Sequence, residues 1–264
     1  MKKLNLCFST LGCTEYSVED VIALSERFSL DAIELRGLCG KMNVYDSEDF
    51  SAENAEASFK KFFDRGISFK VLGTSVSCHE VFSGKQTLDQ FTKDVEFAKT
   101  AKAGFVRVFG NKITENCSSE EIAGVLLSLC EIADPYGVTV LLEVHGDYNS
   151  IETLSPILKR LSKTENFGLI WDICHTDAGY GDGWEEFYLA VKPYIKHVHI
   201  KDRIRQNMKL TSLGKGDIPI KAIAERLSSD GFDGYVSLEW ERKWHPELCC
   251  IEEALSDFVA MMRD

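Results

Sequence analysis

Short apolar runs alternate with longer amphipathic stretches along the chain, and this alternation occurs eight times. In the longer stretches, such as Glu120–Asp134, apolar residues recur every three to four positions, which is typical of a helix buried on one side. Successive apolar runs lie about thirty residues apart, the length of a strand–helix–strand unit. The pattern therefore predicts parallel strands connected by helices. We interpret as strands the runs Leu4–Ser9, Ala32–Arg36, Phe69–Gly73, Phe105–Phe109, Val138–His145, Phe167–Asp172, Ile195–Lys201 and Tyr235–Trp240.

Eight such units within 264 residues favour the α/β class and a closed (β/α)8 TIM barrel over an open sheet. The first run is not followed by the Gly-x-Gly-x-x-Gly pattern of dinucleotide-binding sheets. No stretch rich in Pro and Ser divides the chain, so we expect a single domain over residues 1–264. Ser17, with Asp20 three residues later, is the expected N-cap of the first helix. Glycines expected to end helices with positive φ are Gly66, Gly104, Gly137 and Gly231.

Ionisable residues gather at the C-terminal ends of the last four runs. Side chains of a strand alternate between two faces, and in a barrel one face lies under the helices while the other points to the axis. The axial face becomes polar at the end where the βα loops of TIM barrels build active sites. The residues at these strand ends are Glu143, Asp172, His199 and Glu239.

Three carboxylates at one place repel one another, and a divalent cation removes that repulsion. Oxygen donors with one imidazole suit Mn²⁺ or Mg²⁺, with Co²⁺ and Zn²⁺ as further candidates. The pattern therefore predicts one divalent metal ion, whereas the alternative for each residue is an ion pair that anchors a loop. Glu34, Arg36 and Arg107 fit an ion-pair network inside the barrel as well as a substrate role. His145 fits the support of a neighbouring side chain as well as contact with a substrate.

The balance of charges bears on partners and location. The chain has 42 acidic and 30 basic residues, a net charge of −12, which argues against a nucleic-acid partner because such a partner requires clustered Lys and Arg. No apolar run reaches about 18 residues, so no membrane helix is expected. The residues after Lys3 are too polar for a secretory signal, and we expect a cytoplasmic protein. Nine cysteines without a Cys-x-x-Cys pair argue against a disulfide framework or a structural zinc site.

Several motifs carry a family resemblance. In the second half they are Leu142–Glu143, Trp171–His175, His197–Asp202, Gly214–Pro219 and Ser237–Glu241, and in the first half Ser9–Cys13, Ala32–Arg36 and Val106–Gly110. With these motifs the sequence resembles the xylose isomerase-like TIM-barrel superfamily, in its sugar-phosphate isomerase/epimerase branch, and is similar to ketose 3-epimerases. The resemblance covers nearly the whole chain, and the motifs of the second half are the more specific ones.

The resemblance implies a function and a set of site residues. It implies that one divalent metal ion (Mn, Mg, Co or Zn) is bound by Glu143, Asp172, His199 and Glu239. His199 is preferred over His197 because the family's ligand is the second His of its His-x-His. His175 and Arg205 fall on positions that contact the substrate in the family. A substrate-binding Glu of the family is Asn149 here, which predicts a different recognition of the upper hydroxyls or a substrate other than a free ketohexose.

The implied activity is that of a metal-dependent isomerase or epimerase acting on a small-molecule sugar or sugar phosphate. Glu143 and Glu239 would exchange protons with the carbon next to the carbonyl, through an enediolate. His145 is an additional candidate for substrate binding. The resemblance also implies a homodimer or homotetramer.

Three alternatives stay open from the sequence. A metal-dependent polyol-acid dehydratase of the same fold uses similar chemistry. An endonuclease IV-like phosphodiesterase needs more histidines than the 6 of this chain, and a His where Phe109 stands. A non-catalytic sugar-binding protein would not need both glutamates. The loop Gly214–Asp217 has two interpretations, a phosphate seat built from backbone N–H groups or an ordinary loop.

Overall fold

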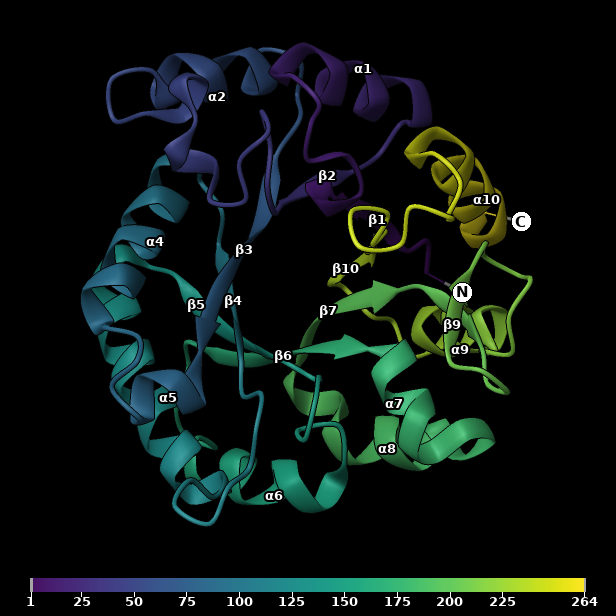
Figure 1. Ribbon diagram of the computed structural model, residues 1–264. Helices are drawn as coiled ribbons and strands as arrows, with labels where there is room; N and C mark the ends of the chain where they lie inside the picture. Colours follow the sequence, from purple (N-terminus) through teal and green to yellow (C-terminus); the bar gives the residue numbers. More distant parts are fainter. Residues whose placement is uncertain (1, 264) are drawn as a thin grey trace. The chain divides into compact units, whose positions relative to one another are not determined.

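A computed structural model describes residues 2–263 and contains eight strands in a closed barrel (Figure 1). Their order around the barrel is β1-β10-β7-β6-β5-β4-β3-β2, so the predicted (β/α)8 barrel is confirmed. The strands are β1 (Asn5–Ser9), β2 (Ala32–Leu35), β3 (Phe69–Ser77), β4 (Phe105–Phe109), β5 (Thr139–Glu143), β6 (Phe167–Asp172), β7 (Ile195–Ile200) and β10 (Tyr235–Leu238). A separate two-stranded sheet consists of β8 (Asp202–Ile204) and β9 (Lys209–Thr211).

Helices follow the strands along the chain. They are α1 (Val18–Phe28), α2 (Ala55–Phe63), α3 (Cys78–Phe82), α4 (Leu88–Thr100), α5 (Ser119–Ala133), α6 (Ile151–Arg160), α7 (Ile173–Tyr180), α8 (Trp184–Val191), α9 (Ile220–Ser229) and α10 (Ile251–Arg263). Within residues 2–263, none of these helices is long and apolar enough to cross a membrane.

The chain divides into two compact units. Unit 1 contains the residues up to Lys70 together with those from His197 onward, and unit 2 contains Val71–Lys196. The expectation that the whole chain forms a single domain stays a prediction.

In unit 1, β1 lies between β2 and β10, and β10 also pairs with β7, all in parallel. Cys7 is in register with Ser237, and Ser237 is in register with His199. This register brings the C-terminal ends of β7 and β10 side by side. The predicted cap of α1 is confirmed, because the Ser17 side chain accepts the N–H of Asp20 and the Asp20 side chain accepts that of Ser17.

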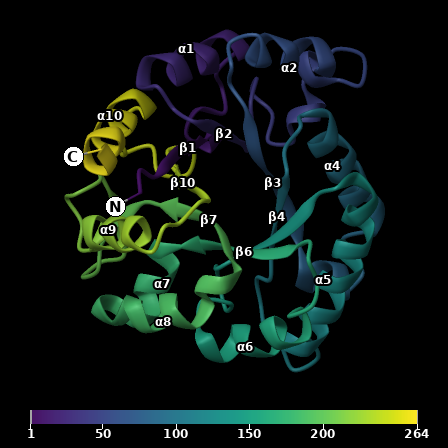
Figure 2. The ribbon, with the colours of Figure 1, turned by 180° about the vertical axis from the view of Figure 1, so that it is seen from behind.

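In unit 2, β3, β4, β5 and β6 form consecutive parallel pairs. Helices α4, α5 and α6 cover the outer face of these strands in both ribbon views (Figures 1 and 2). Val71, Leu141 and Ile170 pack as a buried apolar cluster. Glu143 ends β5 in register with Ile170, so Asp172 lies two residues farther along β6. The C-terminal ends of β5 and β6 therefore present two carboxylates.

Two local features differ from the sequence prediction. Gly66, Gly137 and Gly231 have positive φ as predicted, but before β4 it is Lys102 that adopts φ +54°, so the prediction for Gly104 is wrong. The residue with positive φ therefore stands two positions before the predicted glycine. Helices α3 and α7 follow their strands directly, without the loop that a βα connection normally contains.

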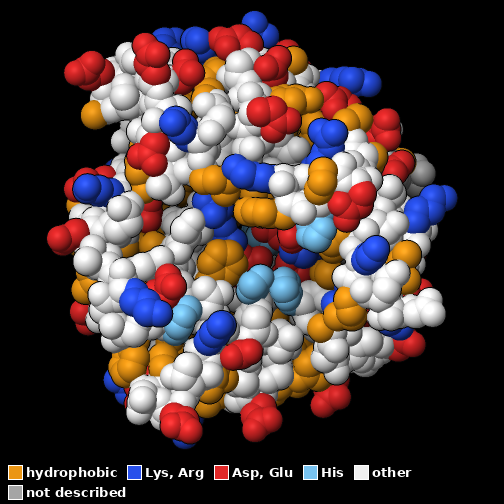
Figure 3. Space-filling model, viewed as in Figure 1, with side chains coloured by type: hydrophobic (Ala, Val, Ile, Leu, Met, Phe, Trp, Pro, Cys, Tyr) orange, Lys and Arg blue, Asp and Glu red, His pale blue; other side chains and the backbone are white. Residues whose placement is uncertain are grey.

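Acidic and basic side chains are interspersed on the face of the molecule drawn in Figure 3. The exposed ion pairs of unit 1 include Lys61 with Glu19 and Arg65 with Glu26. Such exposed pairs contribute little to stability.

Candidate metal and substrate site

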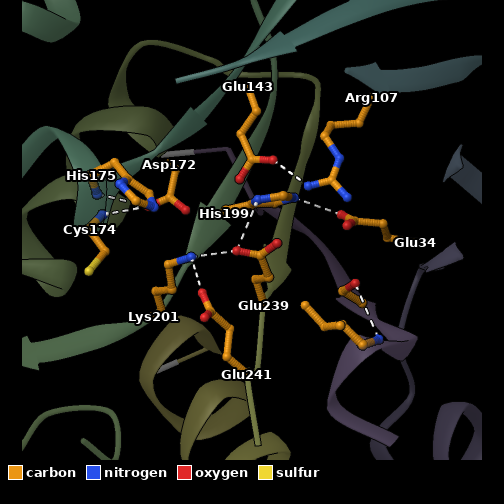
Figure 4. Close-up of polar contacts among 12 residues, drawn as sticks. Glu34, Arg107, Glu143, Asp172, Cys174, His175, His199, Lys201, Glu239 and Glu241 are labelled. Carbon is orange, nitrogen blue, oxygen red and sulfur yellow. Dashed lines mark hydrogen bonds and ion pairs between the residues drawn. The ribbon is translucent and has the colours of Figure 1, made fainter. Parts of the chain in front are cut away.

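In unit 1, a buried carboxylate bridges the two histidines of β7. Glu34, on β2, accepts a hydrogen bond through Oε2 from Nε2 of His197 at 2.8 Å. The same oxygen accepts from Nε2 of His199 at 2.9 Å (Figure 4). All three side chains have no exposure to solvent. Burial by itself would raise the pKa of Glu34, but the adjacent His199 and His197 outweigh it and hold that pKa well below the usual range. Glu34 thus belongs to a polar network inside the barrel, as one of the two sequence interpretations proposed.

The orientation of His199 follows from this contact. A carboxylate can only accept, so Nε2 of His199 carries the proton and Nδ1 keeps its lone pair when the ring is neutral. Nδ1 lies 3.5 Å from Oε2 of Glu239. Glu239 follows β10 directly, and its backbone N–H donates to the carbonyl of Ile200 on β7. A histidine nitrogen and a carboxylate oxygen therefore face one another at the ends of β7 and β10.

Lys201 holds the same oxygen of Glu239 that faces His199. Its Nζ donates to Oε2 of Glu239 at 2.6 Å and to Oε1 of Glu241 at 2.5 Å (Figure 4). Lys201 and Glu239 are buried, whereas Glu241 is partly exposed. The sequence prediction did not include Lys201 in the site, although its side chain shares a strand face with His197 and His199.

In unit 2, Glu143 forms a buried ion pair with Arg107. Nη1 of Arg107 donates to Oε2 of Glu143 at 2.6 Å, and the two side chains are only 3% and 1% exposed. The guanidinium lies over the ring of Phe109 with 4.0 Å between its carbon and the ring centroid. This packing fixes the Arg107 side chain, and through it one oxygen of Glu143.

Asp172 joins a strand to a helix. It is the last residue of β6 and the N-cap of α7, and its Oδ1 accepts the backbone N–H groups of Cys174 at 2.8 Å and His175 at 3.0 Å. Its side chain is fully buried. One donor oxygen of Asp172 and one of Glu143 lie within 4.8 Å of each other, so the carboxylates converge at the ends of β5 and β6.

The rings of His145 and His175 lie close together, and these residues follow Glu143 and Asp172 by two and three positions. The ring centroids of His145 and His175 are 4.0 Å apart, and that of His145 is 5.0 Å from Phe109. Nδ1 of His145 is buried and makes no hydrogen bond within the described residues. Asn149 donates to the backbone carbonyl of His175 at 3.5 Å. Unit 2 therefore brings His145 and His175 together.

Arg205 lies in unit 1, in the turn that connects β8 to β9. It is half-buried, and its backbone N–H donates to Oδ2 of Asp217 at 2.8 Å. The β8–β9 hairpin directly follows β7, so Arg205 belongs to the βα loop region at the C-terminal end of that strand.

The donor chemistry of both units suits a divalent cation. Unit 2 presents two buried carboxylates, and unit 1 presents a carboxylate and an imidazole whose tautomer is fixed. A second candidate group in unit 1 contains Glu34, His197 and His199. In that group both Nε2 atoms already donate to one oxygen of Glu34, so they offer it no lone pairs. The Nδ1 side of His199 is consequently the better donor.

Sequence comparison assigns the chain to a family. The model of a family described as "Xylose isomerase-like TIM barrel" matches residues 22–259. The chain belongs to this family. The match spans most of the chain, so the family resemblance is confirmed.

A similar curated protein is named inosose isomerase and comes from Bacillus velezensis. It is 26% identical over 266 aligned positions, which cover 94% of this chain and 92% of the relative. A solved structure of the IolI protein, which holds a zinc atom, matches with a TM-score of 0.77 and 22% identity over 98% of this chain and 96% of the other. A D-tagatose 3-epimerase-like protein matches with a TM-score of 0.75 and 21% identity, over 98% and 96% of the two chains. At these identities, the structural matches show the shared fold.

Proposed function

We propose that this protein is a divalent-metal-dependent isomerase or epimerase of a small-molecule sugar or sugar phosphate. The observation that carries the proposal is that each unit presents a pair of buried ligand-type side chains at the C-terminal ends of its strands. The strands concerned, β5, β6, β7 and β10, are consecutive in the barrel order. The full-length similarity to a protein named inosose isomerase supports the class of reaction. The proposed ligands of one cation are Glu143, Asp172, His199 and Glu239.

The donor set limits the choice of metal. Three carboxylates and one imidazole suit Mn²⁺, Mg²⁺, Co²⁺ or Zn²⁺, and the zinc atom in the IolI structure supports an ion of this group. Nδ1 of His199 is the proposed nitrogen ligand because Nε2 is engaged by Glu34. When bound, the cation would polarise the carbonyl of the substrate and offset the negative charge that develops on it.

The proton transfers are assigned to the two glutamates. One of them removes a proton from the carbon next to the substrate's carbonyl, and the other delivers a proton to the opposite face. Arg107 holds an oxygen of Glu143, and Lys201 holds an oxygen of Glu239, so both carboxylates have fixed orientations. Delivery to the same carbon gives epimerisation, whereas delivery to the neighbouring carbon gives isomerisation.

Three further side chains are proposed to contact the substrate. His145 and His175 offer ring nitrogens beside Glu143 and Asp172 in unit 2, and Arg205 offers a cation from the hairpin after β7. Nitrogen donors of this kind bind hydroxyl or phosphate oxygens. Asn149 replaces a family carboxylate, so the hydroxyls that this carboxylate would accept are not recognised in the same way here.

Deuterium exchange tests the reaction. The purified protein with Mn²⁺ is incubated in deuterated water with a panel of ketoses, inososes and their phosphates, and exchange is followed by NMR. We expect deuterium at the carbon next to the carbonyl in at least one substrate. Glu239→Gln should abolish exchange while metal analysis still finds one ion per chain. Glu241→Gln is the matched control, because Glu241 contacts the same Lys201 but is not a proposed ligand.

Other outcomes of these measurements would support one of the alternative functions. Three zinc ions per chain would favour a phosphodiesterase, and loss of water from the substrate would favour a dehydratase. Binding of a sugar without any exchange would indicate a non-catalytic protein. Full activity of Glu239→Gln would refute the proposed acid–base role of Glu239.

A further inference from the structure

The loop region after β7 contains a carboxylate that is completely enclosed by backbone N–H groups. Asp202 has no exposure to solvent. Its Oδ1 accepts from the N–H of Arg203 at 2.9 Å and of Ile218 at 3.3 Å. Its Oδ2 accepts from Gly214 at 2.9 Å and Gly216 at 3.0 Å. Burial raises the pKa of Asp202, and these four N–H groups oppose that rise.

The same contacts exclude one interpretation of the Gly214–Asp217 loop. The N–H groups that Asp202 does not accept are also bonded internally, that of Lys215 to the carbonyl of Ser212 and that of Asp217 to the carbonyl of Arg203. No N–H group of residues 214–218 is left to bind an external phosphate. The phosphate-seat interpretation is therefore wrong, because the protein's own carboxylate occupies the concave side of this loop.

Gly216 is required for this arrangement. A Cβ atom at this position would lie 2.2 Å from Oδ1 of Asp202 and 2.5 Å from the backbone oxygen of Arg203. Both distances are far below van der Waals contact, and the two atoms belong to groups that cannot move away without losing their hydrogen bonds. Any other residue at position 216 would push the carboxylate out of the loop.

The enclosed carboxylate connects this loop to Arg205. Asp202 opens β8, and Arg205 follows the end of the same strand. The neighbouring Asp217 donates its N–H to Arg203 and accepts the N–H of Arg205 through Oδ2 at 2.8 Å. The loop is thus hydrogen-bonded to the hairpin at Asp202, at Arg203 and at the backbone of Arg205 itself, and Asp202 accepts the bonds of Gly214, Gly216 and Ile218.

We propose that Asp202 is a positioning residue, whose buried carboxylate fixes the loop 212–218 against β8 and thereby holds Arg205 where it binds an oxygen of the substrate. This inference rests on the proposed function, because it assigns substrate binding to Arg205. It concerns binding and not proton transfer. Loss of the anchor should therefore weaken substrate binding much more than it slows the chemical step.

Two variants of different kinds test the proposal. Asp202→Asn keeps one acceptor but turns an amide NH₂ toward backbone donors, and Gly216→Ala expels the carboxylate without changing charge. Asp230→Asn, at the C-terminal end of α9, and Gly124→Ala, where added Cβ meets open space, are the matched controls. The measurements are amide hydrogen exchange of the peptide covering 212–218, and KM and kcat for the substrate found by deuterium exchange.

We expect both test variants to accelerate amide exchange in 212–218 by about tenfold or more, since the N–H groups of Gly214, Gly216 and Ile218 lose one or both acceptor oxygens of Asp202. We expect KM to rise about tenfold or more, with kcat within about threefold, as the loss of a charge-assisted contact implies. The controls should change neither. If either folded variant accelerates exchange but keeps the wild-type KM, positioning by Asp202 is refuted. If the KM of the variants is unchanged while the wild type is active, the proposed function survives and only the role of Asp202 is refuted. If the wild type turns over no sugar, both the proposed function and the role of Asp202 fail.

Discussion

His199, a proposed metal ligand, is oriented by Glu34, a residue outside the proposed ligand set. Glu34 accepts the Nε2 proton of His199, which fixes the ring orientation and leaves Nδ1 toward Glu239. Carboxylates in this position also increase the basicity of the ligating nitrogen. Glu34 is fully buried among groups that it holds in place. Glu34 would therefore support metal binding by orienting His199, without contacting the cation itself.

Glu34→Gln should therefore weaken metal binding by about 10- to 100-fold while the fold is retained. The glutamine keeps the size of the side chain but removes the charge that favours the Nε2–H tautomer. Titration calorimetry with Mn²⁺ measures the affinity. Glu26→Gln, on the exposed face of α1, is the control for the loss of one acidic charge in the same unit. An unchanged affinity in Glu34→Gln would show that His199 needs no such support.

At the scale of elements, β6 and α7 meet at a residue with one observed role and one proposed role. Asp172 ends the strand, caps the helix through Oδ1, and is a proposed metal ligand. Aspartate and asparagine cap helices about equally well, whereas alanine at an N-cap costs about 1 kcal/mol of stability. The two roles can therefore be separated by substitution.

Asp172→Asn should keep the stability of the metal-free protein, because the amide oxygen still accepts the N–H groups of α7. Asp172→Ala should lose about 1 kcal/mol of unfolding free energy. Both variants should bind Mn²⁺ much more weakly than the wild type. Urea unfolding without metal, followed by metal titration, separates the effects. Ser118→Ala, at the N-cap of α5, measures how much unfolding free energy is lost when a helix cap away from the site is removed. Wild-type metal affinity in Asp172→Asn would remove Asp172 from the ligand set.

A second junction between elements is sensitive to pH. Tyr16, in the segment between β1 and α1, donates its hydroxyl hydrogen to Oε1 of Glu252 on α10 at 2.6 Å. This hydrogen bond is the main cause that lowers the pKa of Glu252 from its ordinary value of 4.5. An acid whose pKa is lowered by folding stabilises the folded state above its unfolded pKa, and this contribution is lost as the pH falls through the folded pKa.

Tyr16→Phe should consequently destabilise the protein by about 1 kcal/mol at neutral pH, since the contact is charge-assisted but partly exposed. The difference from the wild type should shrink as the pH falls below the lowered pKa of Glu252. Urea unfolding at a series of pH values measures both curves. Curves that stay parallel across the acidic range would show that Glu252 is not the group responsible.

At the scale of the whole molecule, the regular part of the fold was predictable and the irregular part was not. The apolar runs mark all eight barrel strands because burial imposes a repeated pattern on them. The hairpin β8–β9 escaped prediction because its strands have three residues each and carry Arg203 and Lys209, so no pattern can develop. Helix α7 escaped because its polar and apolar residues do not separate into two faces.

The candidate site divides in the same way. Strand ends that carry Glu143, Asp172, His199 and Glu239 are visible in a sequence read with the barrel in mind. The contacts that orient them are not, because they depend on which strands become neighbours. The bond between Glu34 and His199 joins residues 165 positions apart, and the bond between Arg107 and Glu143 joins residues 36 apart. Alternation of faces does identify Lys201 as a candidate, but not its partner.

One prediction involves the whole chain, because the proposed ligands come from both units. Binding of a cation by the folded state alone raises the unfolding free energy by about 2.7 kcal/mol at a free metal concentration of 100 times Kd. We expect one cooperative transition in calorimetry, which shifts upward with added Mn²⁺ and saturates at one ion per chain. Unit 2 contains Trp171 and Trp184, and unit 1 contains Trp240 and Trp244, so single-tryptophan variants report each unit separately.

The signals from both units should shift together with metal in the wild type, and neither should shift in Asp172→Ala. A shift confined to the tryptophans of one unit would mean that the cation is bound by that unit alone. In that case the two donor pairs would not form a common site, and the proton transfers assigned to Glu143 and Glu239 could not act on the same substrate carbon.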